Sequence, residues 1–464
     1  MSNIRNVLRF KSGTLLFGGA ELPGCLNSCF IYDPRTLEYR ARGCDYRRIM
    51  ELARANGVDL CDEASAFEPV KLNFVQPLIP RPHQDAAYAA WKRNKWRGIV
   101  ALPTGGGKSF LAAMAIRKLQ RSALILVPTI DLLLQWRSLL KKLFGVEIGM
   151  LGGGEKRVLP ITVSTYDSAV IYMEELGGRF ALLICDECHH LPGAVYRTAA
   201  EQSIAPYRLG LSATPELDPD PERLMRLYEL LGDIIYRVEV AELEGETLAP
   251  YMVKSVVLEL TGKEKEEYEY HRAVYRDFAV RNRIDFGKDS GWRDFLIAVS
   301  RRPDGRRAFL SYLRQRELSR RGAAKLAAVW RILCRHRDER ILIFTADNAM
   351  AYEIGRTFCF PVITHSTKAV ERKSWLDGFR EGIYPVLVAS RVLNEGVDVP
   401  EASIGIVVSG SGSVREHVQR LGRILRGRPG KQAILYELVN SGTAEVYAMK
   451  RRRGHSAYRG KTRS

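Results

Sequence analysis

Short apolar runs that alternate with amphipathic stretches constrain the fold of this chain more than any other feature. Gly98–Leu102 and Ala123–Val127 have the length of buried strands, while Ser109–Leu119 and Leu132–Phe144 carry apolar residues at helical spacing. Strands and helices in alternation predict a parallel sheet covered by helices on both faces. Further strands of this sheet are expected at Ile161–Ser164, Ala181–Cys185 and Tyr207–Leu211.

The same alternation resumes after residue 326 and predicts a second parallel sheet. Between the two, residues 262 to about 326 are rich in arginine and poor in strand signal, which indicates a mostly helical insertion. The strands expected in the second sheet are Ile341–Thr345, Pro361–Ile363, Pro385–Ala389, Ile404–Val408 and Ala433–Leu435.

The first 75 residues have a different pattern and predict a small α+β domain. A short apolar run, Thr14–Phe17, reads as a strand, and Tyr46–Asn56 reads as a helix with one buried face. The proline-rich segment 76–82 then breaks regular structure. The chain has 464 residues, which suggests roughly three structural units. We therefore expect domains at 1–75, 76–240 and 241–464, the last carrying the insertion at about 262–326.

Composition describes a soluble, strongly basic chain. The net charge is +18, with 46% hydrophobic residues, and a positive surface attracts polyanions such as nucleic acid. Judged from charge alone, an arginine-rich surface that is simply solvated is an equally good interpretation. No apolar run approaches the ~20 residues that span a membrane, and the first eleven residues lack the apolar stretch of a signal peptide. We expect a cytoplasmic protein without a membrane partner.

The eight cysteines are spread along the chain and predict free thiols. Cys25, Cys29, Cys44 and Cys61 could in principle hold a metal, but their spacings fit no standard ligand motif, so we interpret them as small apolar residues.

A glycine-rich segment, Pro103-Thr104-Gly105-Gly106-Gly107-Lys108-Ser109, follows the first predicted strand and opens a helix. Such a loop wraps backbone N–H groups around phosphate oxygens at a helix N-terminus. Lys108 would reach the β- and γ-phosphates of ATP, and Ser109 would bind Mg²⁺. Leu102 stands where the strict pattern has glycine, and a glycine-rich turn without a ligand is the alternative.

Two acids, Asp186 and Glu187, follow the buried run Ala181–Cys185. Carboxylates at the carboxyl end of a strand face the ligand crevice of an α/β sheet. We expect Asp186 to hold Mg²⁺ and Glu187 to take a proton from the attacking water. Surface acids on a loop are the alternative. The pairs Cys185/Cys188 and His189/His190 resemble zinc ligands in isolation, but the sequence offers no complete ligand set around them.

In the second predicted sheet, Gln419-Arg420-Leu421-Gly422-Arg423-Ile424-Leu425-Arg426 places Arg423 and Arg426 on one helix face. Two such arginines suit contact with the γ-phosphate. An exposed basic helix is the alternative.

Taken together, these motifs resemble the superfamily two helicases, most closely the archaeal and bacterial XPB-like repair helicases. The resemblance covers nearly the whole chain. It implies two RecA-like domains in tandem with ATP hydrolysed between them. The runs that carry it are Arg81-Pro82-His83-Gln84, the glycine-rich loop, Asp186-Glu187-Cys188-His189, Ser212-Ala213-Thr214, Val392-Leu393-Asn394-Glu395-Gly396-Val397-Asp398 and Gln419 to Arg426.

The resemblance also implies roles for single residues. Arg81 and Gln84 would bind the nucleotide, with Gln84 at the adenine edge, and Gly396 and Asp398 would line the cleft from the second domain. Ser212 and Thr214 would couple nucleotide state to domain motion. Thr165 and Arg391 would touch the nucleic-acid backbone. The N-terminal domain resembles the damage-recognition domain of the family through Tyr32-Asp33-Pro34-Arg35 and Tyr46.

The insertion occupies the place of the family's thumb, and its arginines, including Arg281 and Arg283, would contact nucleic acid. Aromatic residues among them suit stacking on bases, although they could equally form the insertion's own core. The arginines and aromatics in question are Arg272, Arg276, Arg281, Arg283, Arg301, Arg302, Tyr275, Phe278, Trp292 and Phe295.

These observations predict an ATP- and Mg²⁺-dependent DNA translocase or 3′ to 5′ helicase of XPB type, acting in DNA repair alongside a nuclease. Relatives that open DNA carry an Arg-Glu-Asp triplet where this chain reads Pro215-Glu216-Leu217-Asp218-Pro219-Asp220, so translocation is better supported than unwinding. An RNA helicase or restriction-type translocase shares the motor motifs. A DNA-binding or assembly module without activity is the alternative of another class.

Overall fold

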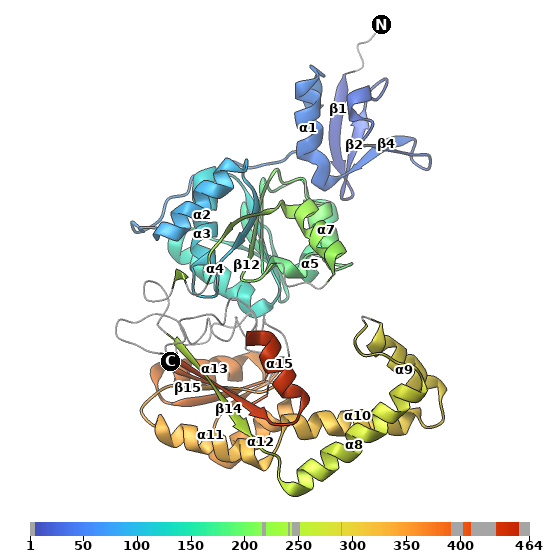
Figure 1. Cartoon of the computed structure of the whole chain (residues 1–464). Coiled ribbons are helices and arrows are strands. Elements are labelled where there is room, and N and C mark those ends of the chain that lie inside the picture. Colours follow the sequence, from blue (N-terminus) through green and yellow to red (C-terminus); the bar gives the residue numbers. More distant parts are fainter. Residues whose placement is uncertain are drawn as a thin grey trace. The chain divides into compact units, whose positions relative to one another are not determined.

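The computed structural model describes residues 5–215, 220–239, 242–243, 251–288, 290–390, 402–409 and 433–453. The chain divides into two compact units, with the boundary between Glu242 and Leu243. Figure 1 shows both units.

The first unit begins with a five-stranded sheet of order β3-β4-β2-β1-β5, packed against one helix. The predicted helix is confirmed as α1, Tyr46–Ala55, whose Ile49 and Ala53 are buried. Together with strand residues such as Leu8 and Leu15, Ile49 forms the core of this small domain. The strands are β1 (Asn6–Lys11), β2 (Thr14–Gly18), β3 (Ile31–Asp33), β4 (Glu38–Arg42) and β5 (Leu60–Asp62).

The small domain packs on the α/β domain that follows it. Backbone hydrogen bonds join Gly13 N to Glu174 O at 3.1 Å and Ala66 N to Gly178 O at 2.9 Å. Arg47 on α1 donates to Lys95 O at 2.7 Å and to Pro206 O at 3.2 Å. The two domains therefore form one unit.

The α/β domain contains the predicted parallel sheet, in the order β13-β6-β12-β11-β7-β10-β8-β9. All neighbours are parallel except β9, which returns antiparallel beside β8. In β7, β10 and β11 every residue is buried, as expected of a sheet covered on both faces. The strands are β6 (Arg97–Ala101), β7 (Ala123–Val127), β8 (Gly149–Gly152), β9 (Glu155–Arg157), β10 (Ile161–Thr165), β11 (Leu182–Asp186), β12 (Tyr207–Ser212) and β13 (Ile234–Arg237).

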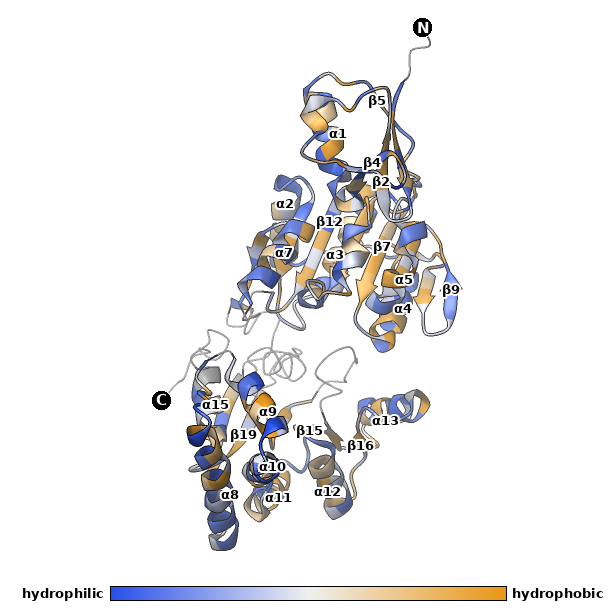
Figure 2. Cartoon of the chain, turned by 90° about the vertical axis from the view of Figure 1, so that its right-hand side faces the viewer, coloured by the Kyte–Doolittle hydropathy of each residue, from blue (hydrophilic) through white to orange (hydrophobic). Residues whose placement is uncertain are grey.

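Capping side chains and glycines set the bounds of helices in this domain, as α4 shows. The Thr129 side chain accepts from Leu132 N and starts α4, and Gly145, with φ of +67°, ends it. The strand β7 is coloured hydrophobic along its length in Figure 2. The helices are α2 (Pro82–Arg93), α3 (Lys108–Leu119), α4 (Ile130–Phe144), α5 (Tyr166–Leu176), α6 (Arg197–Glu201) and α7 (Pro221–Leu231).

The second unit contains a parallel sheet of order β14-β19-β18-β15-β17-β16. Its core gathers Ile341 and Ile343 of β15, Ile404 of β18, and Val329 and Ile332 of α11. The strands are β14 (Tyr251–Leu258), β15 (Ile341–Phe344), β16 (Val362–Ile363), β17 (Val386–Ala389), β18 (Ile404–Val407) and β19 (Ala433–Asn440). The covering helices are α11 (Ala323–Arg335), α12 (Asn348–Phe358), α13 (Ala369–Glu381) and α15 (Ala444–Arg453).

The insertion between β14 and α11 consists of α8 (Gly262–Arg281), α9 (Gly291–Arg301) and α10 (Gly305–Arg320). Figure 1 shows α8 and α10 running side by side, with α9 at their far end. Phe278 and Phe295 are 1% and 0% exposed and form the core of the insertion, with Tyr275 packed against them. Of the two interpretations of the aromatic residues, the structure supports an internal core for these three; Trp292 is 40% exposed and stacks on Phe295.

In the described ranges no helix has both the length and the apolar composition to cross a membrane. Cys29 and Cys44 are buried, Cys25 and Cys61 are partly buried, and the same ranges contain no group of three or more His, Cys, Asp or Glu side chains placed to hold a metal.

Candidate nucleotide-binding and catalytic site

The glycine-rich loop connects the end of β6 to the first turn of α3. Gly105 and Gly107 have φ of +86° and +83°, a left-handed conformation in which other residues are strained. A Cβ on Gly107 would also lie 2.0 Å from Gln84 Nε2. The loop, which contains Thr104 and Gly106 as well, therefore requires glycine for its path, and it delivers Lys108 and Ser109 as the first two residues of α3.

Lys108 joins this loop to the predicted acids. Its Nζ lies 3.6 Å from Glu187 Oε1 and donates to Leu102 O at 3.4 Å. The two side chains are 11% and 14% exposed. Residues almost 80 positions apart in the sequence thus meet at the carboxyl ends of β6 and β11, where open α/β sheets bind ligands.

Asp186 is the last residue of β11 and is only 5% exposed. Trp136 Nε1 of α4 donates to Asp186 Oδ2 at 2.9 Å, and Glu187 N donates to Asp186 Oδ1 at 3.1 Å. Burial, followed by repulsion from the Glu187 carboxylate, raises the pKa of Asp186 to about 6. The two hydrogen bonds fix the orientation of a carboxylate that burial disfavours.

Sequence reasoning missed the supporting residues around Asp186. Trp136 is 2% exposed, and Tyr166, which is fully buried, donates from its hydroxyl to Asp186 O at 3.0 Å. Both looked like apolar core residues of amphipathic helices. The available signal was that a buried indole N–H or phenol O–H needs a hydrogen-bond partner.

Glu187 has a strained backbone, with φ of +46° and ψ of +51°. This left-handed conformation is uncommon for a residue with a side chain, and such residues cluster at functional sites. Glu187 Oε2 lies 3.6 Å from His189 Nδ1.

His189, in the short 3₁₀ helix Cys188–His190 that follows the acids, connects this segment to the end of β12. Its Nδ1 lies 3.1 Å from Ser212 Oγ, and Ser212 Oγ in turn accepts from Thr214 N at 3.2 Å. Burial raises the pKa of the Cys185 thiol to about 12 and that of Cys188 well above its usual value, which disfavours the thiolates that a metal would need. His189 therefore belongs to a link between two loops rather than to a zinc site.

The residues Arg81 and Gln84 lie at the start of α2 beside the glycine-rich loop. Gln84 is 3% exposed; its Oε1 accepts from Arg81 N at 2.9 Å and its Nε2 donates to Gly107 O at 3.4 Å. His83, which the sequence did not single out as a site residue, contacts Gly106 O through Nε2 at 2.8 Å. The start of α2 thus holds the loop in place, and the adenine contact of Gln84 stays a prediction.

The described residues that were predicted to contact nucleic acid lie in both units of the chain. Thr165 is 5% exposed and caps α5, its hydroxyl bonded to Ser168 N and Oγ, so this hydroxyl has a local structural role. Arg281 is ion-paired with Asp277 at 2.8 Å and Asp304 at 3.2 Å. Arg283 is exposed, with φ of +55°. The other predicted site residues lie outside the described residues: Arg391, Gly396, Asp398, Gln419, Arg423 and Arg426.

Three family models match consecutive parts of the chain. The damage recognition domain of the xeroderma pigmentosum group B helicase matches residues 8–64, and the res subunit of type III restriction enzymes matches residues 77–217. The helicase conserved C-terminal domain matches residues 324–428. The matches follow the order of the small domain, the first parallel sheet and the second.

Among solved structures, the helicase domain of Hef from Pyrococcus furiosus has the same fold. It aligns with a TM-score of 0.53 and 21% identity, covering 80% of this chain and 98% of that one. Two RecA-like domains, a small N-terminal domain and a helical insertion therefore describe the chain, as the sequence predicted.

Curated relatives extend the match over the whole chain. "DNA 3′-5′ translocase XPB2" of Sulfurisphaera tokodaii is 41% identical over 447 residues, covering 96% of this chain and 99% of the relative. "DNA 3′-5′ helicase XPB" of Mycobacterium tuberculosis is 32% identical and covers 77% of this chain; the chain spans 60% of its length. The yeast subunit "XPB/SSL2" of transcription and repair factor IIH is 25% identical, and the chain spans 42% of it. This chain belongs to the XPB family of superfamily two helicases.

Proposed function

We propose that this chain is an ATP-driven DNA translocase with 3′ to 5′ polarity that acts in DNA repair. One observation carries the proposal: Lys108, Asp186 and Glu187 gather beside a glycine-rich loop at the carboxyl edge of a parallel sheet. The polarity and the substrate follow the name of the archaeal relative, which this chain matches along nearly its whole length.

ATP would bind with its phosphates against the loop, where the N-terminus of α3 and Lys108 supply positive charge. The oxygen ligands that Mg²⁺ prefers are present, in the Ser109 hydroxyl and the buried Asp186 carboxylate. A divalent cation also fits the charge of the site, since Lys108 lies beside two neighbouring carboxylates, and burial together with repulsion from Glu187 raises the pKa of Asp186. Ser109 and Asp186 would hold the Mg²⁺, which would supply positive charge against the phosphates.

Glu187 would act as the base. Its carboxylate accepts a proton from the water that attacks the γ-phosphorus, while Lys108 stabilises the negative charge of the phosphoryl group. Gln419, Arg423 and Arg426 complete the proposed site from the second domain, where a supplied arginine is worth about 10³ to 10⁵ in rate in related enzymes.

The contacts His189–Ser212 and Ser212–Thr214 offer a route by which the state of the nucleotide changes the loop after β12. We propose that the resulting motion steps the protein along the DNA backbone. Backbone contacts carry little sequence information, so binding would be non-specific and strongly salt-dependent. We place this activity in the cytoplasm, where ATP and DNA meet, and alongside a repair nuclease that cuts the strand presented by the motor.

The deciding experiment measures ATPase rates with duplex DNA, single-stranded DNA and RNA. A Glu187→Gln variant removes the base but keeps the size of the side chain, and we expect its rate to fall by at least about 100-fold. Glu175→Gln is the matched control, because Glu175 is 73% exposed on the outside of the same domain and should keep the full rate.

Each outcome selects one function. Several-fold stimulation by DNA that is lost in Glu187→Gln supports the translocase. Stimulation by RNA alone would identify an RNA helicase, and the absence of hydrolysis with every nucleic acid would identify a binding module.

A further inference from the structure

A cavity of about 390 Å³ lies in the second unit, between the insertion and the sheet. Its walls are one face of α8, one face of α10 and the start of α15, and its floor includes Val407 and Leu438 near the carboxyl ends of β18 and β19. We call it the insertion cavity. Its volume falls in the range of small-ligand sites, and the carboxyl ends of parallel strands are where such sites form.

Four arginines line the insertion cavity in two pairs of like charge. Arg272 and Arg276 stand four residues apart on α8, and Arg316 and Arg320 stand four residues apart on α10. Two cations at this spacing on a helix repel one another and cost stability. An anion placed between them would remove that cost.

These arginines differ from others on the same helices in their partners. Arg314 of α10 is paired with Glu267 at 2.7 Å and with Glu317 at 2.9 Å, and Arg281 of α8 also has two carboxylate partners. Within the described residues, no carboxylate lies within 4.0 Å of the guanidinium of Arg272, Arg276 or Arg316. The charge of these three side chains is available to a ligand.

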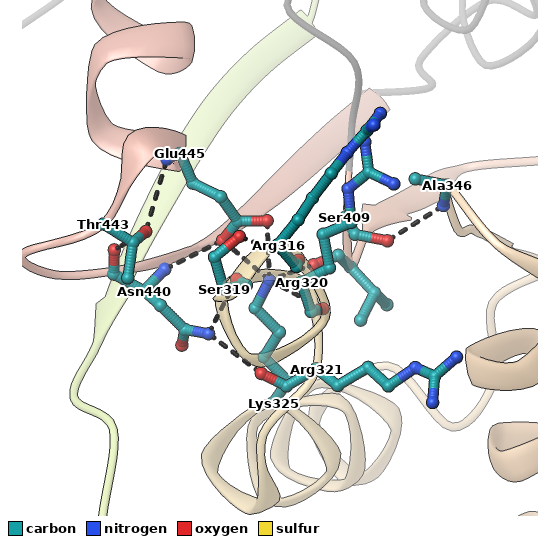
Figure 3. A network of polar contacts seen from close by, with 11 residues as sticks. Arg316, Ser319, Arg320, Arg321, Lys325, Ala346, Ser409, Asn440, Thr443 and Glu445 are labelled. Carbon is teal, nitrogen blue, oxygen red and sulfur yellow. Dashed lines mark hydrogen bonds and ion pairs between the residues drawn. The ribbon is translucent and has the colours of Figure 1, made fainter. Parts of the chain in front are cut away.

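The carboxylates of the cavity do not cancel this charge. Glu445 of α15 is bonded through both oxygens to Nζ of the fully buried Lys325, at 2.8 and 3.0 Å. Figure 3 shows this pair beside Arg316 and Arg320. Glu437, the other carboxylate of the lining, is 1% exposed. Because Arg272, Arg276 and Arg316 have no described carboxylate within ion-pair distance, and Glu445 is committed to Lys325, the lining carries a positive charge that a ligand can use.

Tyrosines provide the remaining chemistry. Tyr275 and Tyr312 belong to the insertion's own core and contribute edges to the wall of this space, while Tyr447 of α15 lines it from the side of the sheet. Tyr447 is 72% exposed, so its ring is accessible from outside. Arginines that pair with phosphate and tyrosines that stack on a base are the combination that binds single-stranded nucleic acid.

We propose that the insertion cavity binds one nucleotide of a single DNA strand, with its phosphate on the arginines and its base or sugar against the tyrosines. The size of the space excludes a duplex and admits a single nucleotide. The inference rests on the proposed function and deepens it, since it assigns the insertion to a single-stranded segment next to the duplex. It also moves the expected contact from Arg281, whose charge is neutralised, to Arg272 and Arg316.

The test compares binding of a blunt duplex with binding of the same duplex carrying a 3′ single-stranded tail, by fluorescence anisotropy over a range of salt. Arg272→Gln/Arg316→Gln should weaken binding of the tailed DNA about tenfold and leave blunt-duplex binding within about twofold. The salt-dependence slope for the tail should fall by about 1.4, at about 0.7 per lost phosphate contact. The control, Arg293→Gln/Arg306→Gln, removes the same charge from exposed positions of the insertion outside the cavity and should not discriminate between the two DNAs.

Photo-crosslinking provides a second measurement that does not depend on folding of a variant. Wild-type protein bound to a tail that carries 5-iodouracil should form crosslinks to the peptide of Tyr447. Crosslinks confined to other segments, or equal loss of affinity for blunt and tailed DNA in the double variant, would overturn the cavity assignment. If DNA-stimulated ATPase persists in that case, the proposed function survives; if wild-type protein neither binds DNA nor responds to it, both fall.

Discussion

Asp186 is an ionisable group placed where water hardly reaches it. Its neighbours Trp136 and Glu187 N each donate one hydrogen bond, but these do not offset burial and the adjacent carboxylate, so its pKa lies near 6 instead of 3.8. A carboxyl group whose pKa is raised by folding binds protons more tightly in the folded state than in the unfolded state. Stability from this group is therefore present below about pH 4 and is lost as the pH rises through about 6.

We accordingly expect Asp186→Asn to raise the Tm of the nucleotide-free protein, and to raise it more at pH 7.5 than at pH 5. A shift of about two pKa units corresponds to up to about 3 kcal/mol at the higher pH. Thermal unfolding of both proteins across this range provides the measurement. A Tm difference that stays constant with pH would contradict the assignment, and added Mg·ATP should stabilise the wild type alone.

At the residue scale, the sequence predicted that the glycine-rich loop and the two acids meet, but not which residues hold them in place; their chemistry stays a prediction. Lys108, Asp186 and Glu187 were predictable because each follows a buried strand, and the carboxyl ends of parallel strands meet at one edge. Trp136 and His83 were not, because their contacts depend on how α4 and α2 pack rather than on their spacing along the chain.

At the scale of elements, Lys325 of α11 joins parts of the second unit that are distant in sequence. Its Nζ bonds Glu445 of α15, Val408 O after β18, and Arg320 O at the end of α10. Asn440 adds hydrogen bonds from its Nδ2 to Ser319 O and Arg321 O, both at 3.0 Å. The base of the insertion is thus fixed to the sheet by buried polar groups (Figure 3).

We expect Lys325→Met to destabilise the second unit by about 3 to 5 kcal/mol, because it leaves the Glu445 carboxylate without its buried counterion. Chemical denaturation measures the loss, and the double variant Lys325→Met/Glu445→Gln should recover much of it. Lys263→Met, at an exposed position of α8, is the control and should stay within about 0.5 kcal/mol. Equal losses in the single and double variants would show that the ion pair has no such role.

The elements themselves were largely predictable. Continuous apolar runs gave β7 and β15 to within a residue, because strands buried on both faces have no polar positions. The hairpin of β8 and β9 was missed, since its strands have four and three residues and are rich in glycine and charge. The spacing of the insertion's aromatic residues suited either stacking on bases or an internal core. The packing of Phe278 and Phe295 in the structure supports the core.

At the scale of the whole molecule, the N-terminal domain is part of the first unit rather than a separate module. Gly43 lies so close to the loop after α6 that a Cβ would approach Gln202 O to 2.6 Å. Gly24 and Gly43 are each the first residue of a short 3₁₀ helix in this domain. A Cβ on Gly24, however, would have no neighbour within 4 Å.

This pair of glycines tests the domain contact directly. Gly43→Ala should lower stability by about 1 to 3 kcal/mol, because backbone atoms on both sides must move apart. Gly24→Ala should change it by less than about 0.5 kcal/mol. Thermal unfolding measures the stability of both variants, and the rate of proteolysis between residues 64 and 80 measures the opening of the domain contact. If Gly43→Ala is cleaved no faster than the wild type, the contact is too loose to have this role.

The strand β12 runs from this contact to the candidate nucleotide-binding site. At one end Arg208, fully buried, donates to the carbonyls of Ala200 in α6 and of Ser203 and Ala205 in the loop after it, beside the Gln202 that contacts the N-terminal domain. At the other end Ser212 holds His189. Four residue steps of strand, about 13 Å, separate the two. Because the strand lies in a close-packed interior, we expect a displacement of the N-terminal domain to be transmitted along β12 to Ser212 and His189, so that whatever this domain contacts would change the rate of hydrolysis.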